Sequence, residues 1–243
     1  MPISFRRSAP AGARAFAPAL LLCLFSLSAA PAIGQDSSPT SAAPTATQKF
    51  MERFDLGISA SGNLNTSVSG IEKRDANTTH SLLTIKPSNS VGELVTIRYT
   101  QKPYVGFEFN FGNARSNQKY TFVPSPSQNI LVGGAQTNVR ELTLGYVAHP
   151  GFRPFGLQPF LGAGGGTIRF KPTPGGGQGL PYQYRAAYYY TLGVEGNFPD
   201  SHFGMRLGFR QLIFLAPDFE QNYLTITRRV RTSEPNIGFF VRF

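Results

Sequence analysis

The chain has 243 residues, of which 15% are charged and 13% aromatic, with no Trp and a formal net charge of +10. Soluble domains carry about 25% charged residues, and helical membrane proteins are far more apolar than a mean hydropathy of -0.15 allows. The positive residues are scattered among alternating segments and form no basic stripe, which excludes nucleic acid as a partner.

Residues 1–34 predict a secretory signal peptide. Arg6, Arg7 and Arg14 give it a basic start, residues 17–30 form an apolar run, and Ala32-Ile33-Gly34 matches a small-x-small cleavage pattern. The run is shorter than the roughly 20 residues that a membrane-spanning helix needs. The segment is therefore expected to direct export and then to be removed.

The only cysteine, Cys23, lies inside this predicted signal. The mature chain would then have no cysteine, which excludes disulfides and cysteine-based metal sites. Leu22 stands where a lipoprotein signal has a small residue, and this argues against lipid attachment at Cys23.

Residues 35–49 are rich in Ser, Thr, Ala and Pro and nearly free of bulky apolar side chains. This composition cannot bury enough apolar surface to fold, so it predicts a flexible periplasmic linker. The remaining residues, 50–243, are expected to form one domain.

Segments in which apolar and polar residues alternate follow the linker. They cover residues 52–65, 91–101, 104–113, 137–148, 158–170, 185–198, 203–215 and 224–243. The third is the clearest, with Phe107, Phe109 and Phe111 on one face and Glu108 and Asn110 on the other. In the Gly-rich fifth segment, the sequence does not show which residues belong to which face. Alternation with period two predicts strands that have one apolar and one polar face.

The connections between these segments alternate in length. Long ones cover 68–90, 115–136, 171–184 and 216–223, short ones 102–103 and 199–202, and an intermediate one 149–157. Long extracellular loops and short periplasmic turns are typical of an up-and-down outer-membrane barrel. Both termini are then expected in the periplasm.

The two faces of the segments differ in a way that separates a membrane barrel from a soluble sandwich or lipocalin. The apolar face is bulky and aromatic, which suits lipid, whereas the polar face combines small residues with charges that suit a narrow lumen. The charged residues on the polar face are Arg98, Glu108, Glu141, Glu195, Arg206, Arg210 and Arg242. The fold class predicted is all-β: an antiparallel up-and-down transmembrane β-barrel of about eight strands.

Two stretches resemble small bacterial outer-membrane barrel proteins of the OmpA/OmpW-like kind. They are HFGMRLGFRQLIFLAPDF, from His202 to Phe219, and PNIGFFVRF, from Pro235 to Phe243. The resemblance covers about residues 50–243. It implies that the last alternating residues are the signal read by the barrel-assembly machinery, with periplasmic chaperones as further partners. These residues are Ile237, Phe239, Val241 and Phe243.

The charges of the polar face allow two functions. They could line a narrow passive pore for ions or small solutes, or they could form a salt-bridged plug. Unpaired charges are costly in a narrow interior, and side chains can fill a barrel of this size, so we favour the plug.

Histidines and glycines offer little chemistry. His149 and His202 fall in predicted periplasmic turns, and His80, next to Ser81, lies in the first long loop. An outer-membrane lipid-modifying enzyme would also need an orienting acid and an oxyanion hole, which the sequence does not show. The Gly-rich run 162–166 lacks the Lys-Ser/Thr of a phosphate loop and more simply lets strands approach or bend.

The sequence thus predicts a monomeric, non-catalytic barrel of the Gram-negative outer membrane, without cofactor or metal, that serves in envelope structure or surface interaction. The polar and moderately basic loops suit outer-membrane lipid and lipopolysaccharide as partners. A narrow pore and, more weakly, a lipid-modifying enzyme stay open as alternatives.

Overall fold

The computed structural model describes residues 45–73, 82–102, 104–123, 131–199 and 201–243. The predicted signal peptide and most of the predicted linker lie outside these residues. The end of the linker is helical: α1 (Ala46–Met51) begins at a capping box, in which Thr45 and Gln48 each accept a hydrogen bond from the other's backbone N–H. Among the described residues, no helix is both long enough and apolar enough to cross a membrane.

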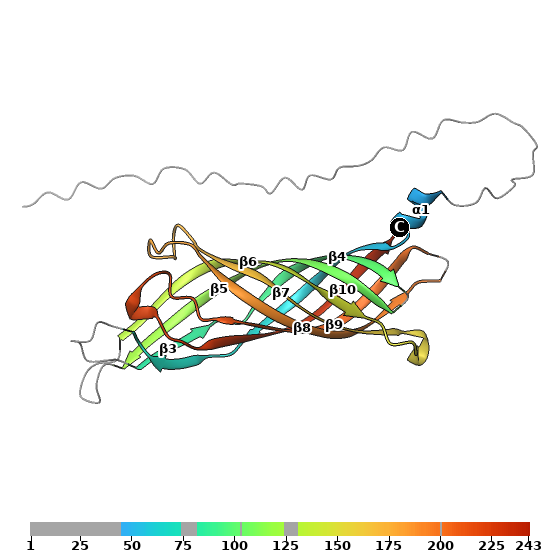
Figure 1. Ribbon diagram of the computed structural model, residues 1–243. Helices are drawn as coiled ribbons and strands as arrows, with labels where there is room; N and C mark the ends of the chain where they lie inside the picture. The colour runs from blue at the N-terminus through green and yellow to red at the C-terminus, as the bar shows by residue number, and fades with distance from the viewer. Residues whose placement is uncertain (1–44, 74–81, 103, 124–130, 200) are drawn as a thin grey trace, which may run out of the picture. The chain divides into compact units, whose positions relative to one another are not determined.

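The described strands form one antiparallel sheet that closes on itself (Figure 1). They are β1 (Phe54–Asn65), β2 (Val68–Ile71), β3 (Leu82–Pro87), β4 (Ser90–Lys102), β5 (Val105–Val123), β6 (Leu131–Ala148), β7 (Gln158–Pro172), β8 (Gln183–Asn197), β9 (Phe203–Leu215) and β10 (Arg229–Arg242). The sheet order is β2-β3-β5-β4-β1-β10-β9-β8-β7-β6, and pairing of β5 with β6 closes an 8-strand barrel. The predicted fold class is confirmed.

The hairpin of β2 and β3 lengthens the wall at the end of the barrel away from α1 and the C-terminus. β1 pairs with β4 up to Asn63 and Ser90, and β2 then pairs with β3 from Val68 and Ile85. β3 pairs with residues 118–123 of β5, which follow residues 105–114, where β5 pairs with β4.

Two of the connections predicted as long loops contain strands. The predicted loop 68–90 contains β2 and β3, and the predicted loop 115–136 contains the ends of β5 and β6, which are 19 and 18 residues long. The alternation continues there, with Ser116 and Gln118 buried and Asn117 and Lys119 exposed. The outward residues of β5 at this end include Arg115, Asn117 and Lys119, so a search for apolar faces misses this extension of the strand.

The boundaries of the other strands lie close to those predicted, except that β10 begins at residue 229 rather than near 224. Burial alternates along the strands in the predicted phase, as in β9, where Phe203, Met205 and Leu207 point outward and Arg206 inward. The open phase of the Gly-rich segment is settled by β7, whose Phe160, Ile168 and Phe170 are buried inside.

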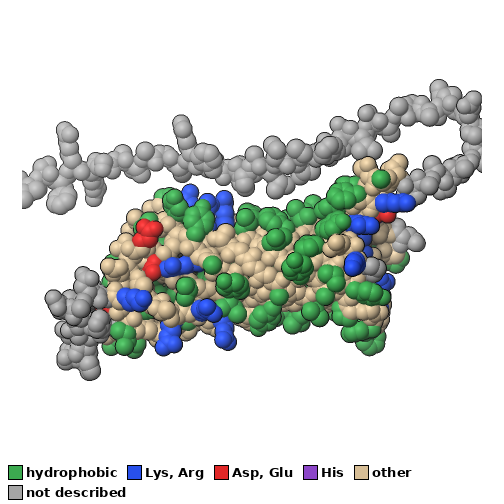
Figure 2. Space-filling model, in the orientation of Figure 1, with side chains coloured by type: hydrophobic (Ala, Val, Ile, Leu, Met, Phe, Trp, Pro, Cys, Tyr) green, Lys and Arg blue, Asp and Glu red, His purple; other side chains and the backbone are tan. Residues whose placement is uncertain are grey.

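Exposed apolar side chains form a belt around the barrel, visible as green atoms along its middle in Figure 2. Leu144 is 59% exposed, Phe239 59% and Leu192 53%. A water-soluble monomer rarely exposes contiguous apolar area beyond a few hundred Å². Lys and Arg side chains gather toward both ends of the barrel in the same view.

Candidate functional site in the barrel interior

The interior nearest the termini is filled by a network of ion pairs around Glu195. Arg98, from β4, places one guanidinium nitrogen 2.8 Å from Glu195 on β8 and the other 3.0 Å from Glu108 on β5. Arg206, from β9, lies 3.0 Å from Glu195 and 3.1 Å from Asp55 on β1. Strands from opposite sides of the barrel are thus joined through one carboxylate.

Two further groups close this network at its outer edge. Arg242 lies 3.4 Å from Glu195, and the Nε2 of His149 lies 3.5 Å from the same carboxylate. The ring of Phe160 stacks beneath Arg98, whose Cζ atom is 4.8 Å from the ring centroid. Arg98, Glu108 and Glu195 are each 1–3% exposed. Charges this deeply buried are tolerated only when they are paired and hydrogen-bonded.

A second network lies farther into the barrel around Arg210 of β9. Its guanidinium pairs with Glu141 of β6 and lies 3.0 Å from Glu234 of β10. The Cζ atom of Arg210 is 4.2 Å from the ring centroid of Tyr189. The Tyr189 hydroxyl donates to Glu108 at 2.9 Å, which links the second network to the first. The two networks therefore form one polar layer across the lumen, defined here as the ionic plug.

The interior at the other end of the barrel is apolar. The buried side chains there come from strands and from the segment 216–228, which joins β9 to β10 and folds inward. They are Leu83, Ile85, Tyr120, Ala135, Ile168, Phe170, Ala187, Tyr189, Leu212, Phe214, Ala216, Phe219, Leu224, Ile226 and Val230, defined here as the apolar plug.

The inward fold of segment 216–228 is held by polar contacts at Asp218. Its carboxylate lies 2.7 Å from the Arg185 guanidinium, and the Gln183 side chain accepts hydrogen bonds from the backbone N–H groups of Asp218 and Phe219 at 3.0 Å. Phe219 and Glu220 adopt positive φ angles of 49° and 59°, a conformation that non-glycine residues seldom take. These contacts place the Phe219 side chain, 0% exposed, inside the mouth.

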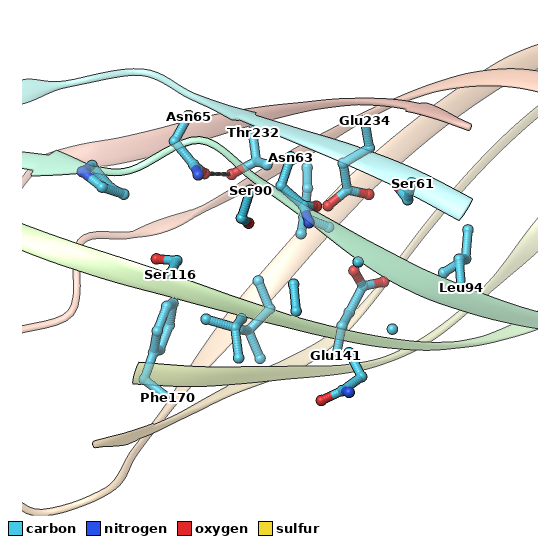
Figure 3. A pocket seen from close by; sticks show the side chains of 18 of the residues that line it. Ser61, Asn63, Asn65, Ser90, Leu94, Ser116, Glu141, Phe170, Thr232 and Glu234 are labelled. Carbon is cyan, nitrogen blue, oxygen red and sulfur yellow. Dashed lines mark hydrogen bonds between the residues drawn. The ribbon is translucent and has the colours of Figure 1, made fainter. Parts of the chain in front are cut away.

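A cavity of about 50 Å³ lies between the two plugs (Figure 3). Glu141 and Glu234 point toward each other from β6 and β10 on its one side, and Phe170 is among the apolar residues on the other. Beside it, the hydroxyl oxygens of Ser61 and Ser90 and the Oε1 of Gln118 have no hydrogen-bond partner among the described residues. With these polar groups on one side, the space has room for ordered water, since one water needs roughly 10–15 Å³ of cavity volume.

The structure places the charged residues predicted for the lumen inside the barrel and brings them together in the ionic plug. Three members were missed: Asp55 and Glu234, which continue the inward phase of β1 and β10, and His149, which was expected in an exposed or merely structural position. His149 is 5% exposed. Asp55 and Glu234 could have been found by extending the alternation, but His149 lies past the end of β6 and has no such signal.

Of the residues predicted as an assembly signal, Ile237 and Phe239 are exposed on the outer face of β10, Val241 of the same strand pairs with Leu56 of β1, and the exposed Phe243 follows the end of β10. His80 and Ser81, which carried the enzyme alternative, lie outside the described residues. Among the residues that are described, no group of three His, Cys, Asp or Glu side chains could hold a metal ion.

Comparison with known proteins finds similarity in the fold. No protein-family model matches the sequence, and no curated protein matches it. Neisserial surface protein A is 15% identical, with 78% of this chain and 97% of that one covered and a TM-score of 0.46. The outer membrane protein OprG from Pseudomonas aeruginosa is 15% identical, with coverage of 78% and 95% and a TM-score of 0.49. Ail of Yersinia pestis, solved with a heparin analogue, is 16% identical, with coverage of 79% and 99% and a TM-score of 0.43.

These neighbours are small 8-strand outer-membrane barrel proteins. At such low identity the likeness concerns the fold alone.

Proposed function

We propose that this chain is an outer-membrane barrel with a closed lumen, acting in envelope structure or surface interaction and carrying out no catalysis. The observation that carries the proposal is the ionic plug. It joins β1, β4, β5, β6, β8, β9 and β10 across the interior through buried ion pairs. A passing ion would have to separate these pairs, and a charge left alone in such an interior costs several kcal/mol.

Conductance in planar lipid bilayers tests the closed lumen. The mature protein should insert without unitary current steps at moderate voltage. A double variant, Arg98→Ser with Glu195→Ser, removes the centre of the ionic plug but leaves the apolar plug in place, so it should also insert without unitary current steps. Reproducible, voltage-independent steps in the unmodified protein would instead establish the passive pore.

The apolar belt supports a place in the membrane, since it surrounds a barrel whose polar groups are turned inward. Faster gel migration of the unboiled than of the boiled protein would indicate a closed barrel in detergent. We propose that the hairpin of β2 and β3 faces outward from the cell, with both termini in the periplasm.

Cysteine labelling can test this orientation, because the mature chain is expected to have no cysteine of its own. Gly175 lies in open space between β7 and β8, and Ser201 lies in the turn between β8 and β9. Gly175→Cys should react with an impermeant maleimide on intact cells, and Ser201→Cys should react only after the outer membrane is opened. The reverse pattern would invert the orientation.

We also propose that Phe243, with Ile237, Phe239 and Val241, is read by the assembly machinery. The support is that Ile237, Phe239 and Val241 share the outward phase of β10, which pairs with β1, and that Phe243 follows directly after this strand. Deleting Phe243 should slow assembly in cells and leave refolding in detergent unchanged.

A further inference from the structure

The outer wall changes abruptly from apolar to basic along neighbouring strands. On β6, the exposed side chains Tyr146, Leu144 and Leu142 are followed outward by Arg140. On β5, the exposed Phe109 and Phe111 are followed by the half-buried Asn113 and then by Arg115. The apolar belt therefore ends at these arginines, on the side of the barrel that carries β2 and β3.

The strand register collects four cations at this border. Arg140 of β6 lies directly opposite Arg169 of β7, and Asn138 of β6 lies between Arg115 of β5 and Lys171 of β7. These four residues, Arg115, Arg140, Arg169 and Lys171, are defined here as the basic cluster. None of them forms an ion pair with a carboxylate in the described part of the chain. Like charges that face each other across strands are destabilising, so this arrangement favours a bound anion.

An open hollow of about 550 Å³ adjoins the basic cluster on the outer wall. It is lined by Val91, Gly92, Glu93, Asn113, Ala114, Arg115, Asn138 and Arg140. The nearest acid, Glu93, accepts a hydrogen bond from Asn113 at 3.1 Å and leaves both arginines without a carboxylate partner. Two guanidinium groups and two side-chain amides beside one hollow supply donors for the oxygens of a phosphate.

We infer that the basic cluster binds the phosphate groups of a lipid headgroup, and that the lipid is lipid A of the outer leaflet. The acyl chains of such a lipid would lie against the belt residues Phe111 and Leu142, while its phosphates reach the level of Arg115 and Arg140. This inference rests on the proposed membrane location and on the proposed outward orientation of the β2–β3 end.

The test measures retention of lipid A by the mature protein in detergent, with native mass spectrometry. The double variant Arg115→Gln with Arg140→Gln should weaken the binding by at least about tenfold, since the two charge-assisted contacts beside the hollow are lost. The matched control is Arg229→Gln with Arg231→Gln, which removes the same charge from exposed positions on the outer face of β10. The control should bind within about twofold of the unmodified protein.

Several outcomes would overturn the inference. Equal weakening by both double variants would mean general attraction to a positive protein, and equal retention of dephosphorylated lipid A would remove the phosphate from the recognition. Displacement of lipid A by millimolar inorganic phosphate would identify a free anion as the ligand. Gel migration of the unmodified protein and of each variant, unboiled, shows whether the barrel has folded. An unmodified protein that migrates as a folded barrel but does not retain lipid A contradicts only this site, and not the barrel.

Discussion

The two halves of the barrel interior are filled by side chains of opposite chemical character. Near the termini the lumen is closed by the ionic plug, in which Glu195 alone contacts Arg98, Arg206, Arg242 and His149. At the other end it is closed by the apolar plug, into which segment 216–228 brings Phe219. Both fill the space, but they differ in what each residue needs from its neighbours.

An ion pair in a dry interior depends on specific partners, because removal of one charge leaves the other buried and unpaired. An apolar side chain depends only on the volume and contacts around it. The ionic plug should therefore be sensitive to single charge changes, and the apolar plug should respond to losses of volume in a graded way.

The largest effect is expected for Arg98→Met, which leaves Glu108 and Glu195 without their shared partner. The free energy of unfolding should fall by about 3–5 kcal/mol. Because the chain has no Trp, unfolding in urea and lipid vesicles is better followed by circular dichroism than by Trp fluorescence. Lys102→Met, at the exposed end of the same strand, is the control and should change stability little. A loss below about 1 kcal/mol for Arg98→Met would contradict the buried ion pairs.

The sequence predicts the features of the two plugs that depend on neighbouring residues, but not the contacts between residues far apart in the chain. The inward direction of Arg98 and Glu108 follows from local alternation, and so does the outward direction of Phe109. The pairing of Arg98 with Glu195 joins residues 97 positions apart, and it depends on how the strands tilt and slide when the barrel closes. No local pattern carries that information.

The apolar half shows a different limit of the sequence. Residues 216–223 have the polar character of a loop, and a loop was predicted there. The inward fold of the segment follows from contacts between Asp218 and residues 183 and 185, on another strand. The burial of Phe219 could not be predicted from the sequence pattern around it.

A smaller effect is expected when volume is removed from the apolar plug. Ile168→Val deletes one methylene group at a position that is 1% exposed, and it should cost about 0.5–1.5 kcal/mol. Ile58→Val, on the 59% exposed outer face of β1, makes the same chemical change and should cost less in the same unfolding experiment. If the two variants lost equal stability, the apolar plug would not be a packed interior.

Within the ionic plug, one carboxylate should be nearly dispensable. Arg210 is faced by both Glu141 and Glu234, so Glu234→Gln still leaves it a counter-charge and a hydrogen-bond acceptor. Stability should change by less than about 1 kcal/mol. Glu195→Gln is the informative partner, since it weakens contacts to three arginines and should cost clearly more. Equal losses would show that the network responds to charge alone and not to the number of partners.

The smallest effect concerns the polar contacts that hold segment 216–228, and it depends on pH. Burial raises the pKa of Asp218, but hydrogen bonds from Gln183 and the Glu220 backbone, together with the Arg185 charge, lower the pKa below its ordinary value of 3.8. A depressed pKa in the folded state means that the contact stabilises the fold above the unfolded pKa and is lost as pH falls through the folded one. Hydrogen exchange of the Phe219 amide, followed by NMR in micelles and corrected for its intrinsic pH dependence, should therefore speed up only below about pH 4. In Asp218→Asn the exchange should be faster throughout and show no such step. A step that persists in this variant would mean that Asp218 is not the group responsible, and that the apolar plug does not depend on the polar contacts of Asp218.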